Sequence, residues 1–205
     1  MRHAAIMKLL IASSNRGKVS EFAALFEKLP FELIGLQDIP DPPEVEETGA
    51  TFEENAVLKA REYALHTGLL TLADDSGLEI EALGGRPGIL SARYGGENTS
   101  FGEKIERLLG ELSKAQGSSR RARFVSVIAI ADAHGEIKFC AEGRCEGMIA
   151  DSPRGENGFG YDPIFVPEGF ELSFGELSDD IKGQISHRAR ASAEIIRFFH
   201  AFTGD

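Results

Sequence analysis

The sequence predicts an α/β protein built on a mixed β-sheet. In the first half of the chain, short apolar runs typical of buried strands alternate with segments whose apolar residues have helical spacing. In the second half, β-rich runs follow one another as a meander, which favours additional antiparallel strands. No repeat, low-complexity segment or interdomain linker interrupts this pattern, so we expect a single domain over residues 1–205.

Start and stop signals place the elements of the first half. Three prolines and several acidic residues indicate a loop over 37–49. Thr51 with Glu54 forms a capping box at a helix start, and Gly68 ends that helix. The expected elements are a strand over 8–12, a helix over 18–28, a strand over 31–35, a helix over 51–66 and a strand over 69–73.

The second half begins with a turn over 74–77, followed by a strand or short helix over 78–83. The segment 132–135 is a hairpin signal between two strands, and Ser186 is a candidate N-cap for the last helix. The remaining expected elements are a rigid loop over 84–88, a helix over 100–114, a polar link over 116–121, strands over 122–131 and 136–143 with a continuation over 145–150, a glycine-rich loop over 153–160 and a helix over 185–203.

Composition narrows the classes of function. The net charge of −11 disfavours broad binding to nucleic acid or to anionic membranes, since both need an excess of Lys and Arg. Cys140 and Cys145 lack zinc-ligand spacing and are expected to be free thiols in a reducing compartment. The sequence contains no long apolar run, and residues 1–7 are too short for a signal peptide. We therefore expect a cytoplasmic protein in which 1–7 is a leader outside the domain.

Two segments could bind phosphate and a metal ion. The turn over 13–18 joins a strand to a helix, where free backbone N–H groups form a phosphate cradle, although a plain capped helix start would give the same pattern. The pair Asp74-Asp75 ends an apolar strand and suits Mg²⁺, with a solvated turn as the alternative. The acidic loop over 44–49 offers a further carboxylate, or is a solvated charged loop.

Two other segments could bind a base. Glycines around the aromatic residues Phe159 and Tyr161 allow a stacking platform, or these rings belong to the core. Lys182, His187 and Arg188 could hold phosphate or recognise a purine edge, or they mark an ordinary helix start. Together the segments suggest a nucleotide site. Because the chain has no G-x-S-x-G elbow and no H-E-x-x-H motif, metal-assisted water attack is favoured over a covalent route.

Six motifs in order carry a family resemblance. They are Ser13-Ser14-Asn15-Arg16-Gly17-Lys18; Glu47-Thr48-Gly49-Ala50-Thr51-Phe52 followed by Glu54-Asn55-Ala56 and Lys59-Ala60; Leu72-Ala73-Asp74-Asp75-Ser76-Gly77-Leu78; Gly88 through Ser91-Ala92-Arg93-Tyr94; Phe159-Gly160-Tyr161-Asp162-Pro163-Ile164-Phe165; and Ile185-Ser186-His187-Arg188. In these the chain resembles the inosine triphosphate pyrophosphatases, also called non-standard purine nucleotide pyrophosphatases, from residue 8 to about 199.

This resemblance implies a two-lobed fold with a long mixed sheet flanked by helices, similar to that of the related septum-inhibitor (Maf-like) class, with the active site in a cleft and a homodimer. It implies Mg²⁺-dependent hydrolysis of ITP, dITP and XTP to monophosphate and pyrophosphate, which cleanses the nucleotide pool. It assigns Asp75 as metal ligand and general base, Asp74 and Lys18 as catalytic support and Glu47 as second metal ligand. The residues expected to contact substrate are Ser13, Ser14, Asn15, Arg16, Gly17, Lys18, Ser76, Phe159, Gly160, Tyr161, Asp162, Lys182, His187 and Arg188.

Two alternatives remain open at the level of sequence. One is a pyrophosphatase of the septum-inhibitor class that acts on modified pyrimidine nucleotides. The other is a nucleotide sensor without catalysis, which would keep the phosphate cradle but has no need for the carboxylates of Asp74 and Asp75.

Overall fold

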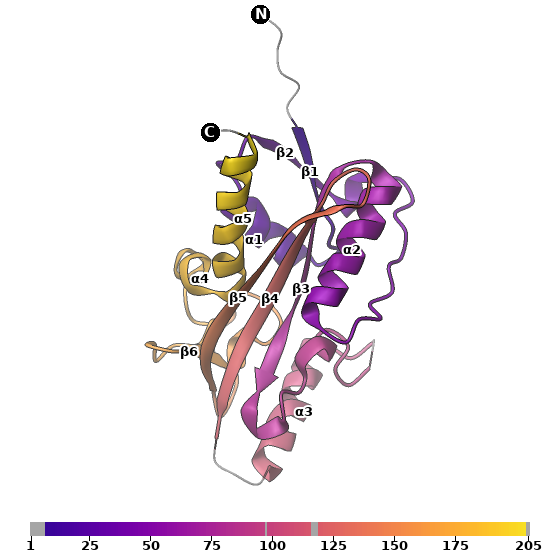
Figure 1. Ribbon diagram of the computed structural model, residues 1–205. Helices are drawn as coiled ribbons and strands as arrows, with labels where there is room; N and C mark the ends of the chain where they lie inside the picture. Colours follow the sequence, from indigo (N-terminus) through magenta and orange to yellow (C-terminus); the bar gives the residue numbers. More distant parts are fainter. Residues whose placement is uncertain (1–6, 97, 116–118, 204–205) are drawn as a thin grey trace, which may run out of the picture. The chain divides into compact units, whose positions relative to one another are not determined.

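The computed structural model describes residues 7–96, 98–115 and 119–203. Their elements, in chain order, are β1 (Met7–Ile11), α1 (Arg16–Leu25), β2 (Phe31–Gly35), η1 (Leu36–Asp38), α2 (Phe52–Thr67), β3 (Leu70–Ile80), η2 (Glu81–Leu83), η3 (Gly88–Leu90), α3 (Phe101–Lys114), β4 (Arg121–Ala131), β5 (Ile137–Ile149), η4 (Asp162–Ile164), β6 (Phe165–Pro167), α4 (Asp179–Ile185) and α5 (His187–Thr203) (Figure 1).

The strands form a mixed sheet, as the alternation of strands and helices predicted. The strand order is β2-β1-β3-β4-β5-β6. β1 pairs in parallel with β2 and with β3, whereas β5 and β6 are antiparallel. The α/β class is therefore confirmed.

The chain divides into two compact units. In unit 1 the described residues fall within Met1–Asp75, Val127–Glu142 and Ala191–Asp205, and in unit 2 within Ser76–Ser126 and Gly143–Arg190. The long strands β3, β4 and β5 each contribute residues to both units.

The core of unit 1 lies between its strands and the helices α1 and α5. Leu9 and Ile11 of β1 point to this side, where they join buried residues of the two helices, among them Phe22 and Phe199. Leu10, between them in β1, is equally buried but must point to the other face because side chains alternate along a strand. Figure 1 shows α2 on that other face of the strands. Unit 1 is therefore covered on both faces, which parallel strands require.

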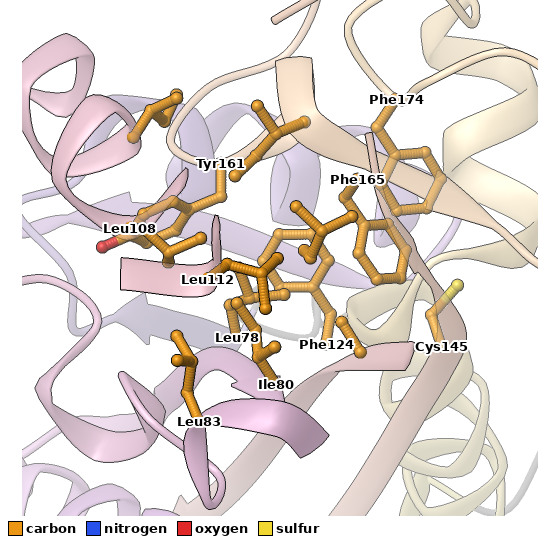
Figure 2. Close-up of a cluster of buried hydrophobic side chains, with 14 of the residues drawn as sticks. Leu78, Ile80, Leu83, Leu108, Leu112, Phe124, Cys145, Tyr161, Phe165 and Phe174 are labelled. Atoms are coloured by element: carbon orange, nitrogen blue, oxygen red, sulfur yellow. The ribbon is translucent and has the colours of Figure 1, made fainter. Parts of the chain in front are cut away.

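The core of unit 2 is aromatic. It collects buried side chains from the end of β3, from α3, from β4 and β5, and from the segment after β5, and Figure 2 labels Leu78, Ile80, Leu83, Leu108, Leu112, Phe124, Cys145, Tyr161, Phe165 and Phe174. The Phe124 ring lies 4.6 Å from Phe165 and 6.3 Å from Phe174, measured between centroids. This cluster fixes the segment after β5, which has little regular structure of its own.

The predicted caps are present. Thr51 Oγ1 accepts the N–H of Glu54 at 3.1 Å, and Gly68 ends α2 in the left-handed conformation. The Glu54 carboxylate, however, accepts the N–H of Ala50 at 2.6 Å, one residue before the expected partner. Ser186 accepts the N–H of Ala189 at 3.1 Å and so caps α5 as predicted.

One prediction about the fold is wrong. The segment 74–77 is not a turn, because β3 runs without interruption from Leu70 to Ile80 through Asp74 and Asp75. A buried strand tolerates these two carboxylates because each has partners in the protein: the side chain of Asp74 pairs with Lys18, and that of Asp75 with Asn55 and Lys59. In the sequence alone, an acidic turn and a strand that carries acidic site residues have the same pattern of residue types.

Smaller differences concern the second half of the chain. β5 is one strand where two were expected, and the short β6 and α4 were not predicted. Of the leader predicted over 1–7, residues 1–6 lie outside the described residues, and Met7 is instead the first residue of β1. Half of the predicted polar link over 116–121, residues 116–118, also lies outside them. Among the described residues, no helix is long and apolar enough to span a membrane.

Candidate functional site

The first part of the candidate site is the turn between β1 and α1 in unit 1. Asn15 is the N-cap of α1: its Oδ1 accepts the N–H of Lys18 at 3.2 Å, while its own N–H donates to Ser13 Oγ at 3.2 Å. The turn therefore directs the start of a ten-residue helix, with its partial positive charge, toward the end of β1. Such a helix start is suited to phosphate oxygens.

Lys18 joins this turn to β3. Its Nζ lies 2.7 Å from Asp74 Oδ2, and the side chains are 15% and 0% exposed. A pair this well covered is screened little by solvent. The cation of the predicted phosphate cradle and the first carboxylate of the acidic pair are thus in direct contact.

Asp75 belongs to a second cluster, around Lys59 of α2. The Lys59 ammonium lies 2.6 Å from Glu47 Oε1 and 3.5 Å from Asp75 Oδ1, and it also donates to the carbonyl oxygen of Asp74 at 2.8 Å. The two residues expected to bind metal therefore converge on one position, which in this structure is taken by an ammonium group. Glu47 is the member of the acidic loop that reaches it.

Burial makes the ionised form of Asp75 costly. Its pKa is raised, first by desolvation and then by the nearby Glu47, against the opposing effects of Lys59, Lys18 and the hydrogen bond from Asn55. Desolvation lowers the pKa of Lys59, but Asp75, Glu47 and Asp74 more than reverse this, and the net effect is a raised pKa. Lys59 therefore stays charged and compensates the carboxylates. Perturbed groups of this kind are typical of functional sites.

The turn also borders a cavity of about 820 Å³ in unit 1, which Ser13, Ser14 and Arg16 line together with residues of α1, η1, α2 and the acidic loop. Ser14 and Arg16 are exposed. Within the described residues, no group of three or more His, Cys, Asp or Glu side chains is placed to hold a metal ion. A metal in unit 1 would therefore depend on fewer protein carboxylates.

The second part of the candidate site lies in unit 2, around Phe159. Asp162 Oδ2 accepts the backbone N–H of Phe159 at 2.7 Å and lies 2.5 Å from Lys182 Nζ, and both charged side chains are 4% exposed. The Lys182 ammonium lies 4.6 Å from the centroid of the Phe159 ring. Gly158, with φ +70°, permits this geometry, because a Cβ there would lie 2.1 Å from Asp162 Oδ2.

Arg188 approaches the same ring from α5. Its Cζ lies 5.8 Å from the Phe159 centroid, and its Nη2 donates to Ser76 Oγ at 3.0 Å. Arg188 is 1% exposed. The structure thus places two cations, Lys182 and Arg188, over the half-buried ring of Phe159. Asp162 pairs with the first cation, and Ser76 accepts a hydrogen bond from the second.

Two residues expected to contact substrate, Tyr161 and His187, have side chains that are buried within unit 2. Tyr161 is buried, donates from its hydroxyl to the Ser91 carbonyl oxygen at 3.0 Å and meets Phe101 edge to face at 5.5 Å. Burial raises the pKa of its phenol, so it stays protonated. His187 is 4% exposed and stacks on Phe124 at 4.7 Å. For these two side chains the structure favours a role in packing.

Sequence reasoning missed Asn55 and Lys59. Both appear in the motif 54–60, but no role was assigned to either. A signal was available: the two residues are four apart on a predicted helix, so they share a face, and a buried helix face rarely carries an amide and an ammonium without a purpose.

Comparison with known proteins agrees with this geometry. The model of the Ham1 family matches residues 9–198. A dITP/XTP pyrophosphatase of Oceanobacillus iheyensis is 45% identical over 94% of this chain and 98% of its own. The structure of a HAM1 protein from Coxiella burnetii is similar with a TM-score of 0.86 at 40% identity, over 97% of this chain and 100% of that one. The Ham1 protein of Staphylococcus aureus gives a TM-score of 0.83 at 44% identity, over 95% and 98%.

The family model covers nearly the whole chain, and the relatives match over almost their full length. The resemblance carried by the six motifs is therefore confirmed, and the chain belongs to the Ham1 family.

Proposed function

We propose that this protein is a Mg²⁺-dependent pyrophosphohydrolase of non-standard purine nucleoside triphosphates such as ITP, dITP and XTP. The observation that carries the proposal is the convergence of Glu47 and Asp75 on one cation position in unit 1. The similarity to relatives named dITP/XTP pyrophosphatase supports the substrate class.

The donor set fits a magnesium ion. Mg²⁺ prefers oxygen ligands, keeps several waters and is commonly bound through one or two carboxylates together with substrate phosphates. Glu47 and Asp75 supply two carboxylates around a position that already attracts a cation. When bound there, Mg²⁺ would act as a Lewis acid on a phosphoryl oxygen and neutralise developing negative charge.

Residues of unit 1 would bind and cleave the triphosphate. The N–H groups at the start of α1 and the ammonium of Lys18 would bind phosphate oxygens. Asp75 would accept the proton of the attacking water, whose oxygen forms a new bond to phosphorus as one P–O bond of the α–β linkage breaks. Asp74 would hold Lys18 in place through its 2.7 Å contact. The products are the nucleoside monophosphate and pyrophosphate.

Residues of unit 2 would select the base. The Phe159 ring offers a stacking surface, and Lys182 and Arg188 lie near it as hydrogen-bond donors. Hypoxanthine and xanthine present a 6-keto acceptor to such donors, whereas adenine presents a 6-amino donor. A buried donor left without a partner costs about 1–3 kcal/mol, or roughly a 5- to 150-fold preference against adenine.

The test is pyrophosphate release from ITP, XTP, ATP, GTP and dTTP, each with and without Mg²⁺. We expect Mg²⁺-dependent release from ITP and XTP and little from the others. Asp75→Asn should lose nearly all turnover and keep a native circular dichroism spectrum. Release from dTTP alone would favour the pyrimidine class, and tight binding of ITP without turnover would favour a sensor; either result would reject the proposal.

We also propose a homodimer, as the family resemblance implies, and a cytoplasmic location, which the free thiols of Cys140 and Cys145 support. Light scattering on the purified protein would test the dimer, and a monomer at working concentration would reject it.

A further inference from the structure

Asn55 is a completely buried amide in the first turn of α2. Its side chain is 0% exposed, yet Oδ1 accepts the N–H of Gly49 at 2.7 Å and Nδ2 donates to Asp75 Oδ2 at 3.1 Å. Asn is a poor helix former, so its presence inside a helix needs another reason. Here the reason is a connection: one amide joins the acidic loop to β3.

Gly49 makes this connection possible. A Cβ on Gly49 would lie 2.7 Å from Asn55 Oδ1 and 2.7 Å from Glu54 Cβ, closer than real Cβ contacts allow. The loop backbone therefore approaches the helix more closely than any residue with a side chain would permit. Glu47 is only two residues upstream, so the position of Gly49 limits where the Glu47 carboxylate can lie.

Lys59 provides a parallel connection one helical turn later. It contacts Glu47 Oε1 at 2.6 Å and Asp75 Oδ1 at 3.5 Å. The two oxygens of Asp75 are thus divided between Asn55 and Lys59. These two contacts differ in kind, because an arriving metal ion would compete with the Lys59 ammonium for the same carboxylates, whereas the neutral amide of Asn55 would not be repelled.

We infer that Asn55 is a positioning residue that fixes the carboxylate of Asp75 relative to the loop bearing Glu47, and so keeps both ligands in place for the metal ion. This inference rests on the proposed function, in which Asp75 and Glu47 bind Mg²⁺. Asn55 touches neither metal nor substrate and acts through the two hydrogen bonds of its amide.

The experiment compares variants at the two ends of this connection with a matched control. Asn55→Leu keeps the branched shape of the side chain but removes both hydrogen bonds, and Gly49→Ala disturbs one of them from the loop side. Thr71→Val is the control: Thr71 is 0% exposed, lies in β3 and donates to the Leu69 carbonyl oxygen at 3.0 Å, away from the acidic residues. Each variant is measured for kcat and KM with ITP, and for Mg²⁺ binding by calorimetry without nucleotide.

We expect Asn55→Leu to lower kcat at least about tenfold while KM for ITP changes less than about threefold, since the variant disturbs the positions of Asp75 and Glu47 and leaves the proposed nucleotide-binding residues intact. Mg²⁺ binding should weaken in Asn55→Leu and, to a smaller extent, in Gly49→Ala, and remain unchanged in Thr71→Val. If both Asn55→Leu and Gly49→Ala match Thr71→Val in kcat and in Mg²⁺ affinity, the inference is overturned. If Asn55→Leu does not fold, Gly49→Ala decides alone.

Asp75→Asn separates this inference from the proposed function. A loss of turnover and Mg²⁺ binding in Asp75→Asn, with both retained in Asn55→Leu and Gly49→Ala, would refute only the role of Asn55. Normal turnover and Mg²⁺ binding in Asp75→Asn would instead refute the proposed site.

Discussion

The pair formed by Asp162 and Lys182 in unit 2 permits a sharp prediction about stability. Both side chains are 4% exposed and their charged atoms are 2.5 Å apart. Lys182→Met removes the ammonium from the buried Asp162 carboxylate, which also accepts the N–H of Phe159. Losing one member of a buried ion pair costs about 3–5 kcal/mol, because the other charge is then uncompensated.

This loss is large relative to the stability of a domain, about 5–15 kcal/mol. With about 2–4 °C per kcal/mol for a chain of this size, the melting temperature should fall by roughly 6–20 °C. Asp162→Asn should be destabilising for the converse reason. The double variant Lys182→Met/Asp162→Asn buries no net charge, so we expect it to recover at least about 2 kcal/mol relative to additivity.

Urea unfolding followed by far-UV circular dichroism is a suitable assay, since the chain has no Trp to report by fluorescence. Lys138→Met serves as the control, because Lys138 pairs with Asp132 and Glu136 at the surface and should destabilise the protein much less. If Lys182→Met costs no more than Lys138→Met, or if the double variant is as unstable as the sum of the single ones, the reasoning from burial is wrong.

Two further predictions concern unit 1. Because burial raises the pKa of Asp75, the folded state binds a proton there more readily than the unfolded state, and ionised Asp75 lowers stability at neutral pH. Metal-free Asp75→Asn should therefore melt above the wild type at pH 7, and the difference should vanish as the pH falls to the ordinary value of 3.8; a lower melting temperature at pH 7 would contradict this. Thr51→Ala removes the N-cap of α2 and should cost about 1 kcal/mol in urea unfolding, whereas Thr51→Ser should be nearly neutral.

The sequence was sufficient for the parts of the fold that local signals determine. The cap at Thr51, the helix end at Gly68 and the hairpin before β5 depend on residues close together in the chain. The course of β3 through Asp74 and Asp75 does not, because it is set by Lys18 and the α2 side chains, which are distant in sequence. Local pattern alone could not show that the partners of these carboxylates are inside the protein.

The same distinction between local and distant signals decides which residues of the candidate site could be predicted. Asp75, Glu47 and Lys18 belong to residue types whose chemistry suggests a role wherever they occur. The spacing of Asn55 and Lys59 could indicate a polar helix face, but the partners of Asn55, a backbone N–H and a side chain twenty positions away, come from the structure. Substrate contact by His187 stays a prediction, and the stacking of its ring on Phe124 is a contact that its residue type did not suggest.

The extended conformation of β3 at the acidic pair constrains how this chain can vary in length. Side chains alternate along a strand, so Asp74 meets Lys18 while Asp75 meets Asn55 and Lys59. Inserting or deleting one residue in β3 before this pair would exchange the two environments, and the adjacent carboxylate would then face the wrong partners. Substitution at either position changes the contacts of that residue alone, whereas a shift of one residue changes those of both, so the fold of this segment should tolerate replacement far better than any change in length.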